Sequence, residues 1–375
     1  MTLRVGVVGT SWWTDAMYLP ALANHPAAKV VAISGRRREP ADELAARWDI
    51  EHVFDNHIDM FASGKVDAVI VATPNDTHAS ISTAALEAGL AVLCDKPLAL
   101  NASDALDLAR LAAARGITTM VPFTYRYMPT SQLVSRLLRE GAIGEPRHMS
   151  ARYYAGYAHG GEYTWRWDRA LAGSGVIGDL GSHWLDLARW LLGEVVAVSA
   201  HATVFVPKSE RPDGAPYEQT EDHAIILTRH ASGAVATLEV SAVAAEGSSF
   251  GQKHLLEIHG STGSLEALND WRHVQVVRLH ERGRNEPHRV VPWPEDLAAS
   301  LRLNDVVDTY HDVFRRTEAM TRAWATAASN KRPCDPDFTV GARVQELVDA
   351  AVTSAAAGGA WQPVPTAWSL STPPR

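Results

Sequence analysis

A short segment just before the middle of the chain combines two carboxylates and an imidazole at helical spacing. The sequence GVIGDLGSHWLD at residues 175–186 contains Asp179, His183 and Asp186. At about 100° per residue these lie at roughly 0°, 40° and −20° on one helix face, where ionisable groups are costly without a purpose. Histidine titrates near neutral pH, so His183 can exchange a proton with a hydroxyl group. Asp179, one turn earlier, can bind hydroxyl groups or orient that imidazole.

Two further groups of polar residues follow predicted strands in the first third of the chain. One is ATPNDTH at residues 72–78 and the other is CDKP at residues 94–97. Both are expected at the carboxyl ends of parallel strands, where open α/β sheets bind ligands. Lys96 can polarise an alcohol or carbonyl oxygen. Asn75 and His78 are expected to line the same end of the sheet, with His78 the more structural of the two.

A glycine turn follows the first predicted strand and indicates a dinucleotide site. Such sites need a close backbone approach to the pyrophosphate and helix N-terminal N–H groups directed at it. The sequence GTSWWT at residues 9–14 keeps only Gly9 of the three glycines of G-x-G-x-x-G, with Ser11 and Thr14 in the other two places. We expect Gly9, Ser11, Trp12 and Trp13 to contact the cofactor. An ordinary strand-to-helix turn is the alternative.

The end of the second predicted strand indicates which cofactor is preferred. An acidic residue there would bind the adenosine ribose hydroxyls, but the sequence is SGRRR at residues 34–38. Arginine can instead pair with a 2′-phosphate. Arg36 and Arg37 therefore predict that NADP(H) is preferred over NAD(H), the alternative being that the three arginines form a solvated helix entrance.

The elements that must position these residues first form an alternating β-α pattern, which is typical of a parallel sheet. Apolar runs predict strands, and amphipathic stretches between them predict helices. The strands are residues 3–8, 29–34, 68–72, 91–94 and 118–122, and the helices are residues 18–24, 40–48, 79–88 and 103–114. Residues 1–123 are therefore predicted to form a doubly wound, Rossmann-type dinucleotide-binding domain.

The pattern changes after residue 123, where strands follow one another without intervening helices. Helices are predicted at residues 132–140, 178–192, 306–329 and 340–357, and strands at residues 147–157, 195–206, 222–229, 234–242, 254–259, 274–279 and 289–291. Glycine-containing turns between them indicate a large open sheet that is mostly antiparallel. Residues 124–375 are predicted to form an α/β domain that binds substrate and mediates oligomerisation.

Composition limits the classes of protein to consider. The 375 residues are 46% hydrophobic with a formal net charge of −8, which predicts a folded soluble protein and argues against nucleic acid as a partner. Two cysteines far apart indicate a reducing compartment. No secretion signal or apolar run of membrane-spanning length is present in the sequence, so a cytoplasmic protein with no membrane partner is expected.

Together these segments resemble the glucose-fructose oxidoreductase, inositol dehydrogenase and rhizopine-catabolism (Gfo/Idh/MocA) oxidoreductase family. The similarity covers nearly the whole chain. Besides the N-terminal turn, the motifs are TPNxxH at residues 73–78, DKP at 95–97, YRY at 125–127, WR at 165–166 and GxxxDxGxHxxD at 175–186. The resemblance implies reversible NAD(P)-linked oxidation of a sugar, cyclitol or related polyol. It also implies homodimers or homotetramers formed through the open sheet.

The resemblance also implies roles for individual residues. Lys96 matches the catalytic lysine, Asp179 the substrate-binding aspartate and His183 the acid/base histidine of the family. Asp95 stands where the family usually has glutamate, which shortens the side chain by one methylene group. The predicted cofactor residues of the TPNxxH and DKP motifs are Thr73, Pro74, Asn75, His78, Asp95 and Lys96.

Aromatic residues before the predicted catalytic helix form a candidate substrate surface, because aromatic faces suit the apolar faces of sugar rings. Packing alone accounts for many of these rings. Tyr125 and Arg126 follow the predicted domain junction, and Arg126 has an ion pair across it as an alternative role. The predicted substrate-binding residues are Tyr125, Arg126, Tyr157, Trp165, Arg166, Asp179 and His183.

Three other functions fit parts of the pattern. Asp179, His183 and Asp186 have ligand types suited to a divalent ion, but no H-x-x-x-H pair accompanies them, and no metal is predicted. A family member could use tightly bound NAD(P) as a recycled cofactor for glycoside hydrolysis or internal oxidoreduction. A non-catalytic NADP(H)-binding sensor would need neither Lys96 nor His183, so their presence together argues against it.

Overall fold

The computed structural model describes residues 2–245, 252–271, 274–283 and 288–365. These residues form two compact units, each considered by itself. The first contains residues 2–123 and 313–345, and the second contains the described residues of 124–312 and 346–365. The predicted boundary after residue 123 coincides with a unit boundary. Residues 313–345, however, pack with the first unit, although the sequence division placed them in the second domain.

A six-stranded parallel sheet forms the centre of the first unit, in the order β3-β2-β1-β4-β5-β6. This confirms the Rossmann-type fold. In this unit the sequence pattern missed β3, because its three residues are only half-buried and show no apolar run. The strands are β1 (Leu3–Val8), β2 (Ala28–Ser34), β3 (His52–Phe54), β4 (Ala68–Val71), β5 (Ala91–Cys94) and β6 (Thr119–Met120).

Helices alternate with these strands along the chain. The two ends of α5 illustrate how the sequence sets where a helix begins and ends. The Asn101 side chain accepts the Asp104 N–H at its start, and Gly116 adopts φ 61° at its end. The helical elements are η1 (Thr14–Tyr18), α1 (Leu19–Ala23), α2 (Arg38–Trp48), α3 (His57–Ala62), η2 (Asn75–Thr77), α4 (His78–Glu87) and α5 (Ala102–Arg115). η1 is a π-helical turn, directly after the glycine turn.

The predicted helix at residues 306–329 is wrong in one respect, because it is two helices, α10 (Val306–Arg315) and α11 (Met320–Ser329). Between them the Thr317 hydroxyl donates to the Val313 carbonyl at 2.9 Å, and Ala319 is extended with φ −131°. A hydroxyl that occupies a carbonyl in this way competes with helical hydrogen bonding. α11 then packs beside α1 and against β1, β2, β5 and β6 of the parallel sheet.

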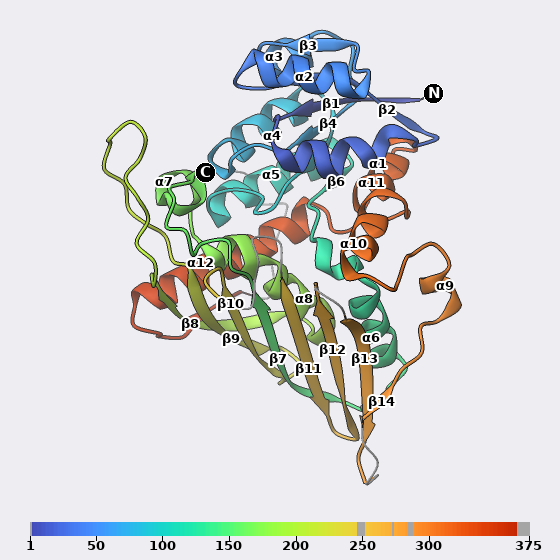
Figure 1. The fold of residues 1–375 in the computed structure, drawn as a ribbon, viewed down its shortest axis with the longest axis vertical. Coiled ribbons are helices and arrows are strands. Elements are labelled where there is room, and N and C mark those ends of the chain that lie inside the picture. The colour runs from blue at the N-terminus through green and yellow to red at the C-terminus, as the bar shows by residue number, and fades with distance from the viewer. Residues whose placement is uncertain (1, 246–251, 272–273, 284–287, 366–375) are drawn as a thin grey trace. The chain divides into compact units, whose positions relative to one another are not determined.

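A nine-stranded sheet forms the second unit, in the order β14-β13-β12-β11-β7-β10-β9-β8-β15 (Figure 1). Only β7 and β10 pair in parallel, which confirms a mostly antiparallel sheet. The strands are β7 (Pro146–Tyr154), β8 (Val195–Thr203), β9 (His223–His230), β10 (Val235–Ser241), β11 (Lys253–Gly260), β12 (Gly263–Asp270), β13 (Val274–Glu281), β14 (Arg289–Val290) and β15 (Gln362–Pro363).

Helices cover one face of this sheet. α6 packs against β12 and β13, and α8 packs against β7 and β10. The helical elements are η3 (Thr124–Tyr127), α6 (Pro129–Arg139), η4 (Trp165–Trp167), α7 (Arg169–Ala172), η5 (Ile177–Gly181), α8 (Ser182–Leu192), α9 (Glu295–Ala298) and α12 (Phe338–Ala356), whose first residues belong to the first unit. Side chains of β9 and β10 alternate between this buried face and an exposed one. Within the described residues, no helix has the length and apolar character needed to cross a membrane.

Candidate active site

The helix predicted to bear the catalytic residues begins with the π-helical turn η5 and continues as α8. Its start lies close to the segment that immediately precedes β9. A Cβ on Gly175 would be 1.9 Å from the Glu221 carbonyl oxygen, so only glycine fits there. The Val176 N–H donates to that carbonyl at 3.0 Å, and the Ile177 N–H donates to Glu221 Oε1 at 3.1 Å. These contacts fix the first turn of the helix.

Asp179 lies within η5 and has two partners on neighbouring segments. The Tyr157 hydroxyl donates to Asp179 Oδ2 at 2.7 Å, and Arg166 Nε lies 3.9 Å from the same oxygen. The Asp179 side chain is 27% exposed. Burial and the Asp179 charge raise the pKa of Tyr157 well above its ordinary value, which keeps its hydroxyl a donor. The structure therefore brings together three predicted substrate residues: Tyr157, Arg166 and Asp179.

His183 is buried in the first turn of α8. The ring of Tyr125 packs edge-on against it, with centroids 4.7 Å apart. Because Tyr125 is itself buried, this contact restricts the imidazole to a narrow range of orientations. His183 and Asp179 thus follow one another on the same helix, each held by a different tyrosine.

The Tyr125 hydroxyl is bound inside the unit. It lies 2.7 Å from the Tyr153 hydroxyl and 2.8 Å from Gln252 Oε1, which also lies 3.2 Å from His254 Nε2. Burial lowers the pKa of His254 to about 3, so this imidazole is neutral. Sequence reasoning included Tyr153 in the aromatic stretch before the predicted catalytic helix, but it missed Gln252 and His254. For Tyr153 and His254 the available signal was the alternation of β7 and β11, which turns both side chains toward the helix-covered face.

Asp186 does not join the group around Asp179. Arg126 forms a two-pronged ion pair with it, in which Nε donates to Oδ2 at 3.0 Å and Nη2 to Oδ1, and both side chains are buried. The guanidinium also lies 5.5 Å from the centre of the Trp190 ring. Asp186 is thus held in an ion pair with Arg126 within the second unit. No cluster suited to a metal ion occurs among the described residues.

The remaining predicted aromatic residues lie beside this group. The Arg166 guanidinium stacks over the ring of its neighbour Trp165 at 4.6 Å, and Tyr157 stacks on Trp167 with centroids 5.8 Å apart. Trp167 also receives the Lys208 ammonium at 4.7 Å. Sequence reasoning missed this support for Tyr157 from η4.

In the first unit, the first position of the glycine turn is one that requires glycine. Gly9 has φ 118°, and a Cβ on it would be 2.2 Å from the Ala72 carbonyl oxygen. Thr14 is buried, and its hydroxyl donates to the Gly9 carbonyl at 3.1 Å. Ser11 Oγ accepts the Thr14 N–H at 3.3 Å. Ser11 and Thr14 therefore replace two glycines with a local hydroxyl network that closes the turn.

Two tryptophans and two arginines border this turn. The Trp12 side chain is 59% exposed, whereas Trp13 packs edge-on against Phe314 at 5.4 Å. Arg36 and Arg37 follow β2 and are exposed. Neither makes an ion pair with any residue that the structure describes. The next arginine, Arg38, is paired with Asp42 and Asp55.

The predicted motifs after β4 and β5 lie on neighbouring strands, as the parallel order requires. After β4, the Thr77 hydroxyl donates to the Thr73 hydroxyl at 2.8 Å, and Asn75 is buried. After β5, Asp95 Oδ1 accepts the Lys96 N–H at 2.8 Å. Burial raises the pKa of Asp95, against the lowering effect of Lys96 and His78. The shorter Asp95 thus contacts the lysine through its backbone.

The residues of the first unit fit a dinucleotide. Gly9 allows the turn to pass close to the Ala72 carbonyl, and the helical segment η1 follows, so helix N-terminal N–H groups are available beside the turn. The exposed Arg36 and Arg37 lie after the neighbouring strand. The predicted cofactor residues thus belong to the first unit and the predicted substrate residues to the second.

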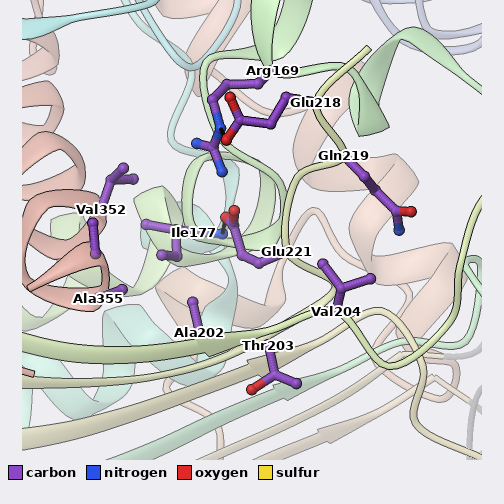
Figure 2. Close-up of a pocket in the computed structure, with 11 residues that line it drawn as sticks. Arg169, Ile177, Ala202, Thr203, Val204, Glu218, Gln219, Glu221, Val352 and Ala355 are labelled. Atoms are coloured by element: carbon purple, nitrogen blue, oxygen red, sulfur yellow. Dashed lines mark hydrogen bonds and ion pairs between the residues drawn. The ribbon is translucent and has the colours of Figure 1, made fainter. Parts of the chain in front are cut away.

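A separate cavity of about 440 Å³ lies in the second unit, between the start of the catalytic helix and the end of β8 (Figure 2). Arg169 and Glu218 face one another at one end of it and form an ion pair of 2.6 Å. Glu221 also lines it, and burial raises the pKa of this carboxyl. None of the predicted site residues lines this cavity.

Family models match both units. Residues 3–123 match a model described as an oxidoreductase family with an NAD-binding Rossmann fold, and residues 131–266 match the GFO/IDH/MocA C-terminal domain. These matches cover most of the chain.

Relatives along the full length agree with these matches. The chain is 29% identical to levoglucosan dehydrogenase of Pseudarthrobacter phenanthrenivorans, covering 97% of this chain and 98% of the relative. It is 32% identical to dTDP-3,4-didehydro-2,6-dideoxy-alpha-D-glucose 3-reductase of Streptomyces antibioticus, covering 87% and 97%. A solved structure of levoglucosan dehydrogenase in complex with NADH and levoglucosan has a TM-score of 0.85 at 26% identity, covering 98% and 100%.

Proposed function

The chain belongs to the Gfo/Idh/MocA family of oxidoreductases, and from this premise we propose that it transfers a hydride between a nicotinamide cofactor and a secondary alcohol or ketone. The substrate is a sugar, cyclitol or related polyol. Relatives that act on levoglucosan and on a nucleotide-linked deoxysugar support this class. The local observation that carries the proposal is Asp179, bound by Tyr157 and placed one turn before His183.

In the direction of oxidation, the substrate carbon loses a hydride and its hydroxyl loses a proton. His183 accepts that proton, and the edge contact with Tyr125 keeps its ring oriented for the transfer. Asp179 accepts hydrogen bonds from neighbouring substrate hydroxyls, since a carboxylate oxygen has room for more than one donor. Lys96 donates to the reacting oxygen and polarises it. The bound nicotinamide supplies the hydride acceptor.

The cofactor is NADP(H) in preference to NAD(H). Arg36 and Arg37 are exposed after β2, and their guanidinium groups are able to pair with a 2′-phosphate. Cys94 and Cys334 are both free thiols, which supports a reducing, cytoplasmic location.

A dehydrogenase assay tests the reaction. Purified protein is incubated with NADP⁺ or NAD⁺ and a panel of sugars, anhydrosugars and cyclitols, and nicotinamide reduction is followed by absorbance. We expect steady reduction with at least one member. His183→Asn should lower kcat by roughly 10²–10⁴-fold, the usual contribution of an acid/base group, and Lys96→Met should lower it strongly as well. Lys29→Met, at an exposed position on β2, is the matched control and should leave kcat unchanged.

The other outcomes identify the alternatives. Conversion of a glycoside or sugar with no net change in cofactor would indicate a recycled nicotinamide. A different result would be that the protein binds NADPH but converts no panel member, and that Lys96→Met leaves its function in the cell unchanged. This result would indicate a sensor and overturn the proposal.

A further inference from the structure

His78 is a buried histidine at the junction of two cofactor motifs. It is the first residue of α4, and its side chain lies between the segment after β4 and the segment after β5. Its residue exposure is 1%. The reaction proposed above assigns it no part.

Both nitrogens of its ring face backbone carbonyl oxygens. Nδ1 lies 2.8 Å from the Pro97 oxygen, and Nε2 lies 2.9 Å from the Thr73 oxygen. A backbone carbonyl can only accept a hydrogen bond, and a neutral imidazole has only one N–H to donate. In a neutral His78, one ring lone pair would face a buried carbonyl oxygen. Neither group would then have a hydrogen bond to compensate for its removal from water, which destabilises the folded protein. Only the imidazolium satisfies both contacts.

The groups around His78 are consistent with a cation. Burial alone would lower its pKa, but the neighbouring Cys94 sulfur, the Pro97 carbonyl and the Asp95 carboxylate raise it, to about 9. Lys96 lowers the pKa of the neighbouring Asp95 carboxyl. By contrast, His25 in the same unit accepts the Ala27 N–H at Nδ1, as a neutral imidazole does, and burial lowers its pKa.

We propose that His78 is an imidazolium at neutral pH that ties the TPNxxH segment to the DKP segment and thereby positions Asn75 and Lys96 for the cofactor. It is a positioning residue, which acts through the two carbonyls it binds. The effect on cofactor binding rests on the proposed function, whereas the protonation state does not.

The charge sets a direction for the effect of pH. The pKa of His78 is raised in the folded protein, so its stabilising contribution is complete below the ordinary histidine pKa of 6.5. It is then lost as pH rises through about 9. The tie between the two segments should therefore hold at neutral pH and weaken between about pH 8 and pH 10.

Solid-state ¹⁵N NMR of histidine-labelled protein without cofactor tests the protonation state. The difference between spectra of the wild type and His78→Gln isolates the two nitrogens of His78, and the same subtraction with His25→Gln isolates a neutral reference. At pH 7.5 we expect two protonated nitrogens for His78 and one unprotonated nitrogen for His25. An unprotonated nitrogen at His78 would overturn the proposal, whatever reaction the protein catalyses.

Fluorescence titration with NADPH and NADH tests the positioning role. His78→Gln keeps a donor to one carbonyl but cannot carry the charge, so we expect a roughly tenfold higher Kd at pH 7.5. We also expect the wild-type rise in Kd between pH 8 and pH 10 to be missing. His25→Gln should leave both unchanged. A purely structural role would lower the melting temperature of His78→Gln while leaving the Kd and its pH profile as in the wild type, and that result would refute positioning.

Discussion

The Tyr157 hydroxyl donates a 2.7 Å hydrogen bond to Asp179 Oδ2, and the two residues come from segments separated by 22 positions in the chain. Tyr157 is held in turn by stacking on Trp167. Asp179 therefore does not rely on its own helix alone for its orientation.

Tyr157→Phe keeps the stacked ring and removes only this hydrogen bond. Because a hydrogen bond to a charged group contributes about 1.5–3 kcal/mol, we expect kcat/KM for the sugar substrate to fall roughly tenfold or more. The Kd for the nicotinamide cofactor should not change. Steady-state kinetics with a substrate found in the panel measure the first, and fluorescence titration the second.

Tyr163→Phe is the matched control, since this tyrosine also donates to an aspartate, Asp168, at 3.1 Å. If both variants lowered kcat/KM equally, the effect would come from loosening of the aromatic segment rather than from Asp179.

The buried ion pair of Arg126 and Asp186 makes a different prediction, on stability. Removing one partner leaves an uncompensated charge in the interior, which costs about 3–5 kcal/mol. We therefore expect Arg126→Met to lower the free energy of unfolding by that amount in urea denaturation. In Arg126→Met/Asp186→Leu neither charge remains, and part of the loss should be recovered.

Arg136→Met removes an arginine from an exposed pair with Asp296 and should leave the urea midpoint unchanged. A double variant as unstable as Arg126→Met would contradict the interpretation that the unpaired charge is the cause.

The sequence was sufficient for the elements whose apolar spacing is unambiguous. The predicted parallel strands and the helix at residues 178–192 follow such spacing, and the structure confirms them with small shifts at their ends. It was insufficient for β12, where Asn269 occupies a buried position because its amide donates to Thr130 Oγ1 at 2.8 Å. A polar residue at that position breaks the alternation that predicts a strand.

The candidate site shows the same division. The types and spacing of Asp179 and His183 were visible in the sequence, but the partner of Asp186 was not. Asp186 pairs with Arg126, which is 60 positions away in the chain. The role of Thr14 was also hidden, since only the folded turn brings its hydroxyl to the Gly9 carbonyl.

Cofactor preference depends on two exposed arginines. Arg36→Ala/Arg37→Ala removes both guanidinium groups from the end of β2, so we expect the Kd for NADPH to rise at least tenfold while the Kd for NADH changes little. Fluorescence titration of the twelve tryptophans, one of which is the exposed Trp12, provides the measurement.

Arg38→Ala serves as the control, because Arg38 is already paired with Asp42 and Asp55. If the double variant bound NADPH and NADH as tightly as the wild type does, the arginines would be only a solvated helix entrance.

The open face of the nine-stranded sheet predicts self-association. On β9 and β10 the side chains that point away from the helices include Ile225, Leu227 and Val235, which are all exposed. Neighbouring apolar side chains on an uncovered sheet face favour burial against a second copy.

We expect light scattering at micromolar concentration to give a mass of at least twice 40.7 kDa. Leu227→Glu should reduce that mass to a single chain, because the substitution places a carboxylate in the contact. Ile58→Glu, at an equally apolar and exposed position on α3 of the first unit, should leave the mass of the assembly unchanged. A wild type that scatters as one chain, or dissociation by both substitutions alike, would rule out this face as the contact.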